Sequence, residues 1–180
     1  VQVLKDPLGT KGARLTTFIT IPSRYLVYMP KGRGIGISAR IEDEAERHRL
    51  REAAALFVRP EESGGYIVRT AAEGATPDAL RADMMFLQKL WQVLSEKAAS
   101  TRAGNLVHED LALPVRVLRD VVSSGVDKVN VDHADTFQRM KEFARTFMPD
   151  HSERIEQYRG DRPIFDLYGI EDEIQRSLDR

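Results

Sequence analysis

Residues 64–74 read Gly64-Gly65-Tyr66-Ile67-Val68-Arg69-Thr70-Ala71-Ala72-Glu73-Gly74. The apolar centre of this stretch favours a β-strand, and glycines precede the strand and close the loop that follows it. The pattern predicts a buried strand that ends at Arg69 and Thr70, where side chains meet solvent. A guanidinium offers a planar fork of donors that matches phosphate oxygens, and the adjacent hydroxyl adds another donor. Backbone N–H groups of the turn up to Gly74 are further candidate donors, as in an anion nest.

Two interpretations of Arg69 stay open from the residue types alone. In the first, Arg69 and Thr70 bind a terminal phosphate group. In the second, Arg69 pairs with a surface carboxylate such as Glu61 or Glu73, in a structural domain without a phosphate site. Surface ion pairs of that kind contribute little to stability.

The composition is that of an ordinary folded protein. The chain has 180 residues, of which 42% are hydrophobic and 31% charged, which allows one or two domains with a real core. No apolar run is as long as a membrane span, no signal-peptide pattern opens the sequence, and no membrane partner is expected. The absence of cysteine excludes disulfides and cysteine-based zinc sites. The first residue is Val1 rather than Met, which agrees with a piece of a longer protein.

The charge is unevenly distributed along the chain. The formal net charge is −1, which argues against strong nucleic-acid binding by the chain as a whole. Residues 1–40, however, contain seven Lys or Arg residues against Asp6 alone. Such a segment either attracts a polyanion or is simply a solvated basic hairpin.

The first half of the chain predicts β-structure followed by two helices. Residues 1–30 are rich in strand formers and turn residues, and residues 32–36 are a glycine-rich flexible loop without the ending of a nucleotide-binding loop. Residues 41–58 form an amphipathic helix. A longer helix begins at Pro77 with Thr76 as its N-cap, and its apolar stripe, which includes Trp91, is a packing surface. Residues 98–104 are a linker.

The second half alternates helix, strand and helix, which is typical of an α/β unit. Helices are expected at 113–122 and 170–178 and strands at 128–131 and 155–158. Asp132 is expected to cap a helix that ends before Pro149. The four histidines lack the spacing of metal ligands, so no metal site is predicted. The fold class expected for the whole chain is mixed, α+β with an α/β part.

Four stretches make the chain similar to a known family. They are residues 1–17 (VQVLKDPLGTKGARLTT), 23–30 (SRYLVYMP), 66–74 (YIVRTAAEG) and 162–167 (RPIFDL). Together they resemble the ribonuclease E/G family, most closely its ribonuclease G branch, and the resemblance runs from Val1 to Arg180.

The resemblance implies three parts. Residues 1–20 would be the end of an OB-fold RNA-binding domain, residues 21–114 a 5′-sensor domain, and residues 115–180 part of a ribonuclease-H-like subdomain without a catalytic role.

The resemblance also implies a site. Arg69 and Thr70 would bind the 5′-monophosphate of RNA, Val27 would pack on the terminal nucleotide, and Ser23 stands where ribonuclease E has a glycine of the same pocket. Arg40 matches an arginine near this pocket. Lys11 matches a lysine that contacts RNA, although a hairpin-tip lysine present for solubility is the alternative.

The parent enzyme implied by the resemblance is a cytoplasmic, homo-oligomeric endoribonuclease of rRNA processing and mRNA decay. It would cut single-stranded RNA with a Mg²⁺ ion held by two aspartates that follow this chain. The chain itself would then have no catalytic residues, no cofactor and no activity. A non-catalytic RNA-binding module or a structural interaction module are the alternatives.

Overall fold

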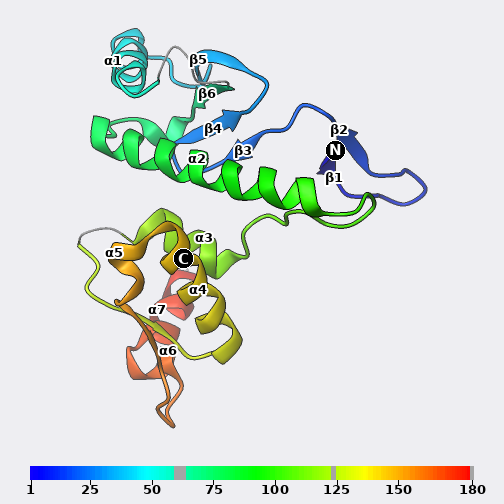
Figure 1. The fold of residues 1–180 in the computed structure, drawn as a ribbon. Coiled ribbons are helices and arrows are strands. Elements are labelled where there is room, and N and C mark those ends of the chain that lie inside the picture. Colours follow the sequence, from blue (N-terminus) through cyan, green and yellow to red (C-terminus); the bar gives the residue numbers. More distant parts are fainter. Residues whose placement is uncertain (59–63, 123–124, 179–180) are drawn as a thin grey trace. The chain divides into compact units, whose positions relative to one another are not determined.

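The computed structural model describes residues 1–58, 64–122 and 125–178, which form two compact units (Figure 1). The first unit is Val1–Glu109 and the second is Asp110–Arg180. Both combine helices with strands, so the expected mixed α+β fold class is confirmed. The assignment of residues 1–20, 21–114 and 115–180 to three domains stays a prediction. No helix within the described ranges is long and apolar enough to cross a membrane.

A four-stranded sheet is the centre of the first unit. In spatial order its strands are β3 (Ile21–Pro22), β4 (Leu26–Met29), β6 (Gly64–Val68) and β5 (Arg33–Ile37). β6 is therefore an interior strand, as its apolar sequence predicts. It pairs antiparallel with β4 and parallel with β5. Two parallel neighbours require a crossover connection, and helix α1 (Glu44–Ala55) lies in it.

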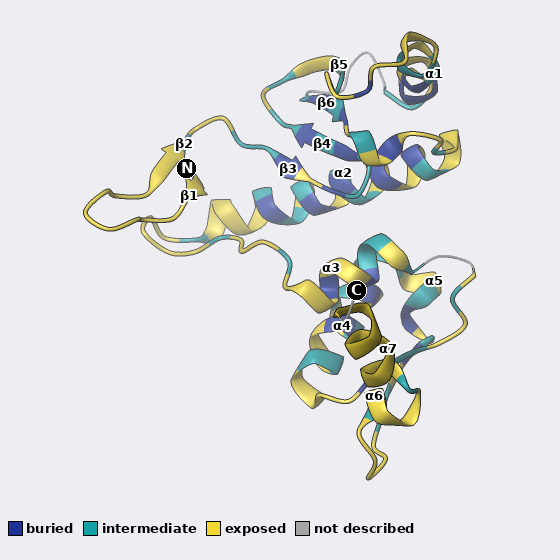
Figure 2. Ribbon diagram, turned by 180° about the vertical axis from the view of Figure 1, so that it is seen from behind, coloured by how far each residue is buried: buried dark blue, intermediate teal, exposed yellow. Residues whose placement is uncertain are grey.

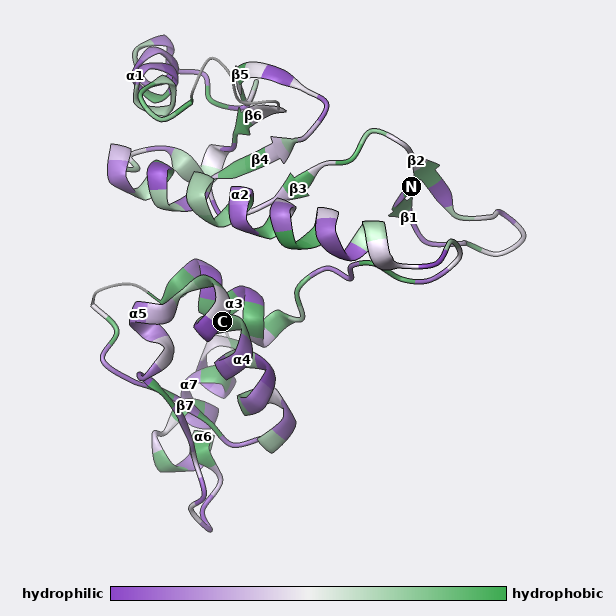
Figure 3. Ribbon diagram, viewed as in Figure 1, coloured by the Kyte–Doolittle hydropathy of each residue, from purple (hydrophilic) through white to green (hydrophobic). Residues whose placement is uncertain are grey.

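One face of this sheet is covered by helix α2 (Pro77–Ser100) (Figures 1 and 2). Figure 3 shows hydrophobic residues, in green, along much of β3, β4 and β6. Alternate residues of β4 and β6 are fully or almost fully buried, and the rings of Tyr28 and Tyr66 lie 5.1 Å apart. Trp91 packs beside them, 6.4 Å from Tyr28 between ring centres. The Thr76 hydroxyl accepts from the Ala79 N–H at 3.2 Å, which confirms the predicted cap.

A separate two-stranded antiparallel sheet is formed by β1 (Gln2–Lys5) and β2 (Arg14–Thr16). In the loop between them, Leu8 and Lys11 form a bridge with two backbone hydrogen bonds of 3.1 Å, and Gly9 takes the positive φ of 59° that the turn requires. Most side chains of this hairpin are exposed.

The second unit is built around a short parallel pair of strands, β7 (Val129–Val131) and β8 (Ile155–Gln157). Helix α4 (Ala134–Phe147) lies in the crossover between them, as the alternating pattern predicts, and α3 (Leu113–Val121) packs on α4. The remaining helices are α5 (Pro149–Ser152), α6 (Ile164–Leu167) and α7 (Ile170–Leu178). The buried core is Val115, Leu118, Val131, Met140, Ala144 and Ile155.

The structure corrects four expectations about elements. The prediction of a flexible glycine-rich loop at 32–36 is wrong, because most of these residues form β5, whose backbone pairs with β6. The first helix is shorter than 41–58 and is capped by Asp43, whose carboxylate accepts from the Ala45 N–H at 2.9 Å. The linker at 98–104 begins too early, because α2 continues to Ser100. The cap of α4 is His133 rather than Asp132, since its ring nitrogen accepts from the Thr136 N–H at 3.3 Å.

Candidate functional site

A three-residue connection, Ser23-Arg24-Tyr25, joins β3 to β4 beside the end of β6. A hydrogen bond of 2.8 Å from the Ser23 N–H to the Leu26 carbonyl closes this turn. Asp83 of α2 holds the same connection from the buried side, because its Oδ2 accepts from the Tyr25 and Leu26 N–H groups, each at 2.9 Å. The carbonyl groups of the connection are thereby fixed in direction.

Arg69 follows β6 directly and is held by those carbonyl groups. Its backbone N–H donates to the Tyr25 carbonyl at 2.8 Å and extends the pairing of β4 with β6. Its guanidinium Nη1 donates to the Ser23 carbonyl and lies 3.5 Å from the Arg24 carbonyl. The residue is exposed. The side chain is therefore oriented by neutral acceptors at a surface position.

No carboxylate in the described part of the chain forms an ion pair with Arg69. Glu73, one of the two alternative partners, is exposed and makes no such pair. Glu61, the other, lies outside the described residues. A guanidinium that is oriented but carries no acidic partner keeps its charge and its remaining donors available to an anion.

Thr70 begins the short 3₁₀ helix η1 (Thr70–Ala72) and is half-buried. Within the described ranges its hydroxyl has no hydrogen-bond partner. The prediction that the N–H groups of the following turn are available to an anion is wrong for three of them. These three N–H groups already donate hydrogen bonds within the protein. The Ala72 and Glu73 N–H groups donate to the Arg69 and Thr70 carbonyls at 3.0 Å, and the Gly74 N–H donates to Glu46 at 2.8 Å.

Helix α1 fixes this turn through one ion pair. Arg49 donates two hydrogen bonds of 2.6 Å to the carboxylate of Glu46 and one of 2.9 Å to the Ala75 carbonyl. The bonds from Arg49, followed by the N–H of Gly74, lower the pKa of Glu46 from 4.5 to about 2. The carboxylate of Glu46 therefore stabilises the loop that carries Thr70 through its bonds to Arg49 and to the Gly74 N–H.

The face of the sheet opposite the tyrosine core carries a half-exposed apolar pair. Val27 of β4 lies directly across from Ile67 of β6. Because side chains alternate along a strand, Ile67 and Arg69 belong to the same face. In the connection that precedes β4, the Arg24 guanidinium lies over the Tyr25 ring at 4.7 Å. An apolar surface thus adjoins the exposed cation.

Arg40 is exposed and follows β5, the parallel neighbour of β6. The Ser38 N–H donates to the Val68 carbonyl at 2.8 Å, so the two strands end at the same edge of the sheet. Arg40 and Arg69 therefore both follow the C-terminal ends of these parallel strands, at the same end of the sheet. Lys11 is exposed in the loop of the separate β1–β2 hairpin and is not part of this sheet.

Ser23 is placed differently from what a phosphate ligand requires. The residue is fully buried, and its hydroxyl lies 2.5 Å from Asp83 Oδ2 and 3.0 Å from the Leu26 carbonyl. Its side chain therefore supports the connection from inside, while its carbonyl faces Arg69.

The sequence interpretation missed Asp83 and the Glu46–Arg49 pair. Asp83 gave one usable signal, because it stands three residues after Leu80 and four before Leu87 on the buried stripe of α2, where an acidic residue requires a partner. The pair at positions 46 and 49 has the spacing of neighbouring residues on a helix.

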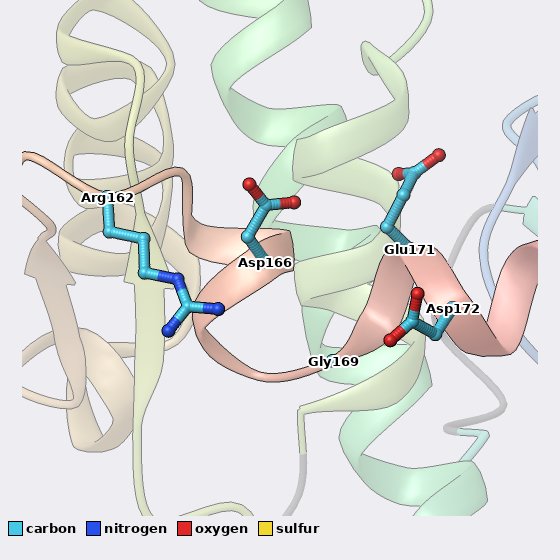
Figure 4. A pocket seen from close by; sticks show the side chains of 5 residues that line it. All are labelled: Arg162, Asp166, Gly169, Glu171 and Asp172. Atoms are coloured by element: carbon cyan, nitrogen blue, oxygen red, sulfur yellow. The ribbon is translucent and has the colours of Figure 1, made fainter.

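Two further observations concern metal and phosphate binding by the described residues. They contain no group of three or more His, Asp or Glu side chains with metal-binding geometry. A hollow in the second unit is lined by Arg162, Asp166, Gly169, Glu171 and Asp172 (Figure 4). Its acidic residues outnumber its single arginine, which disfavours binding of a polyanion.

Comparison with known proteins identifies the family to which the chain belongs. The sequence model of the Ribonuclease E/G family matches residues 20–180, and the chain belongs to this family. A Ribonuclease G from Salmonella typhimurium (strain SL1344) is 46% identical over 180 residues, which cover 100% of this chain and 36% of that protein. Ribonuclease G from Escherichia coli (strain K12) gives the same values. A Ribonuclease E from Nostoc sp. (strain PCC 7120 / SAG 25.82 / UTEX 2576) is 40% identical over 181 residues, covering 99% of this chain and 26% of that protein. The chain thus spans only about a third of the length of these Ribonuclease G relatives.

Proposed function

We propose that this chain supplies the part of a ribonuclease that recognises the 5′-monophosphate of single-stranded RNA. The observation that carries the proposal is the state of Arg69: exposed, held in direction by the Ser23 and Arg24 carbonyls, and without an acidic partner in the described part of the chain. Membership of the Ribonuclease E/G family and the names of the relatives support RNA as the ligand.

The proposed binding mode uses the donors that the protein leaves available. Nη1 of Arg69 is engaged with carbonyl oxygens, so the Nη2 and Nε groups form the fork that meets two phosphate oxygens. The Thr70 hydroxyl donates to a third oxygen. A 5′-triphosphate brings more charge and volume to a site with few cations and binds less well.

The apolar pair beside Arg69 is proposed to receive the first nucleotide, with Val27 packing on its base. Bases are accessible for such contacts only where RNA is unpaired, which favours single-stranded ends. Arg40, at the same edge of the sheet, adds a second phosphate contact. Lys11, in the separate β1–β2 hairpin, is proposed to contact the backbone of the RNA. The contribution of Ser23 is limited to its carbonyl, because its hydroxyl is buried.

The names of the relatives support ribonuclease activity for the longer protein. Beyond those names, we propose that it is a cytoplasmic, homo-oligomeric endoribonuclease in rRNA processing and mRNA decay. Docking of the 5′ end would increase the fraction of RNA held productively. The Mg²⁺ of that longer protein is proposed to be held by two aspartates that follow this chain, and the function proposed for this chain involves no step at a metal. The chain itself is proposed to bind RNA ends without cleaving them.

The test compares the dissociation constants of two oligonucleotides of one sequence, one with a 5′-monophosphate and one with a 5′-hydroxyl. Arg69→Ala should weaken binding of the monophosphate by about 1.5–3 kcal/mol, or roughly 10- to 150-fold, the scale of a charged hydrogen bond. The matched control is Arg33→Ala, which removes an exposed arginine at the start of β5 and should leave the ratio of the two constants unchanged. Equal affinities for both oligonucleotides, unaffected by Arg69→Ala, would leave only the structural alternative.

A further inference from the structure

Asp83 is the only charged side chain that is buried among the residues the structure describes, with 8% of its surface exposed. A buried carboxylate is costly unless hydrogen bonds compensate it. Here a single oxygen, Oδ2, accepts from the Ser23 hydroxyl at 2.5 Å and from the Tyr25 and Leu26 N–H groups at 2.9 Å each. Two of these donors belong to the connection that also holds Arg69, and the third is the N–H of Leu26, the first residue of β4.

Two consecutive peptide groups lie between Asp83 and Arg69. In the first, the Tyr25 N–H donates to Asp83 and the Arg24 carbonyl lies 3.5 Å from Arg69 Nη1. In the second, the Leu26 N–H donates to Asp83 and the Tyr25 carbonyl accepts from the Arg69 backbone N–H at 2.8 Å. None of the described peptide bonds is cis, so the N–H and the carbonyl of each group point in opposite directions. Each peptide group is therefore a bridge from the buried anion to the exposed arginine.

This arrangement orients Arg69 without neutralising it through a direct ion pair. A carboxylate that accepts a peptide N–H polarises that peptide and makes its carbonyl a better acceptor for a cation on the other side. Direct pairing would instead occupy the guanidinium fork, which is the part that matches phosphate. Donors fixed in advance also need less reorganisation when an anion arrives.

We propose that Asp83 is a positioning residue for Arg69 and acts through the peptide groups on either side of Tyr25. Its effect on RNA rests on the proposed function, whereas its effect on the order of the Arg69 side chain does not. The proposal therefore predicts a change in Arg69 even when no RNA is present.

The experiment uses Asp83→Asn in the chain of residues 1–180. An amide of the same shape keeps the packing but loses the charge that strengthens the bonds to the N–H groups. Asp78→Asn, in the first turn of the same helix, controls for loss of an exposed acidic charge. Leu94→Ala, at a buried position three turns further along α2, controls for loss of stability alone.

Two quantities are measured on each variant that is folded at the working temperature. One is the ratio of dissociation constants for 5′-hydroxyl and 5′-monophosphorylated oligonucleotides. The other is the order parameter of the Arg69 Nε–H group by NMR, without RNA. Asp83→Asn should lower the ratio by about 5- to 10-fold and increase the mobility of Nε–H, while both controls keep the wild-type values.

Unchanged Nε–H order in Asp83→Asn would overturn the proposal, as would an equal change in Leu94→Ala. A wild-type chain that does not distinguish the two oligonucleotides would instead refute the proposed function, and the NMR comparison would still decide whether Asp83 positions Arg69. Ser23→Ala, which removes one of the three donors, should have a smaller effect of the same sign on Nε–H order, and a wild-type value there would also count against the proposal.

Discussion

Gly65→Ala tests the close contact of β5 with β6 on which the shared edge of Arg40 and Arg69 depends. A Cβ atom at residue 65 would lie 2.7 Å from the Arg33 backbone nitrogen and 2.9 Å from its carbonyl carbon. These neighbours are backbone atoms of the paired strand and cannot rotate away. Overpacking of this kind costs about 1–3 kcal/mol, which corresponds to a melting temperature lower by roughly 5–15 °C for a unit of this size.

The matched control lies on the neighbouring strand of the same sheet. A Cβ atom at Gly36 would meet only the Ile67 side chain at 3.7 Å and the Tyr66 carbonyl at 3.9 Å, which are ordinary contacts. Gly36→Ala should therefore be nearly neutral, or stabilise by about 0.4–1 kcal/mol through the unfolded chain.

Urea unfolding followed by tryptophan fluorescence measures both variants, because Trp91 is the only tryptophan and packs beside Tyr28 in the core of the first unit. We expect a large loss of stability for Gly65→Ala and little change for Gly36→Ala. The close contact would be refuted if Gly65→Ala were as stable as the wild type, or if both variants lost the same free energy of unfolding.

Two further predictions concern pH and helix capping. Because the pKa of Glu46 is lowered from 4.5 to about 2, its contribution to stability is complete above pH 4.5 and is lost as the pH falls through about 2. The difference in melting temperature between wild type and Glu46→Gln should thus shrink as the pH falls from 4.5 to about 2. The control Glu42→Gln, in the preceding loop, should show no such trend. A difference for Glu46→Gln that stays constant over this range would contradict the ion pair. His133→Ala should lose about 0.5–1 kcal/mol in urea unfolding followed by circular dichroism, and Asp132→Ala should lose less, since His133 is the residue that caps α4. The opposite order would restore Asp132 as the cap.

Local signals in the sequence were sufficient where a single segment determines its own structure. Thr76 and Pro77 predict the start of α2 because a hydroxyl at the cap and a proline in the first turn act on adjacent residues. Tyr66, Ile67 and Val68 predict an interior strand because all three favour a pleated, buried surface.

The features that the sequence did not predict depend on partners far along the chain. β5 contains Gly34 and Gly36, which have low strand propensity, and it forms because its backbone pairs with residues about 30 positions later. Asp83 is stabilised by N–H groups 57 and 58 residues earlier in the sequence. The N–H of Gly74, expected to face an anion, is bound by Glu46 of α1, 28 residues away. A pattern within one segment can show that a residue such as Asp83 requires a partner, but it does not identify a partner that lies far away in the sequence.

The most direct test of the phosphate-binding proposal is a crystal structure of this chain with a short 5′-monophosphorylated RNA. We expect the terminal phosphate to lie within hydrogen-bond distance of the Arg69 guanidinium and the Thr70 hydroxyl, with the first base against Val27. A guanidinium paired with Glu61 or Glu73, and a phosphate bound elsewhere, would contradict the proposal.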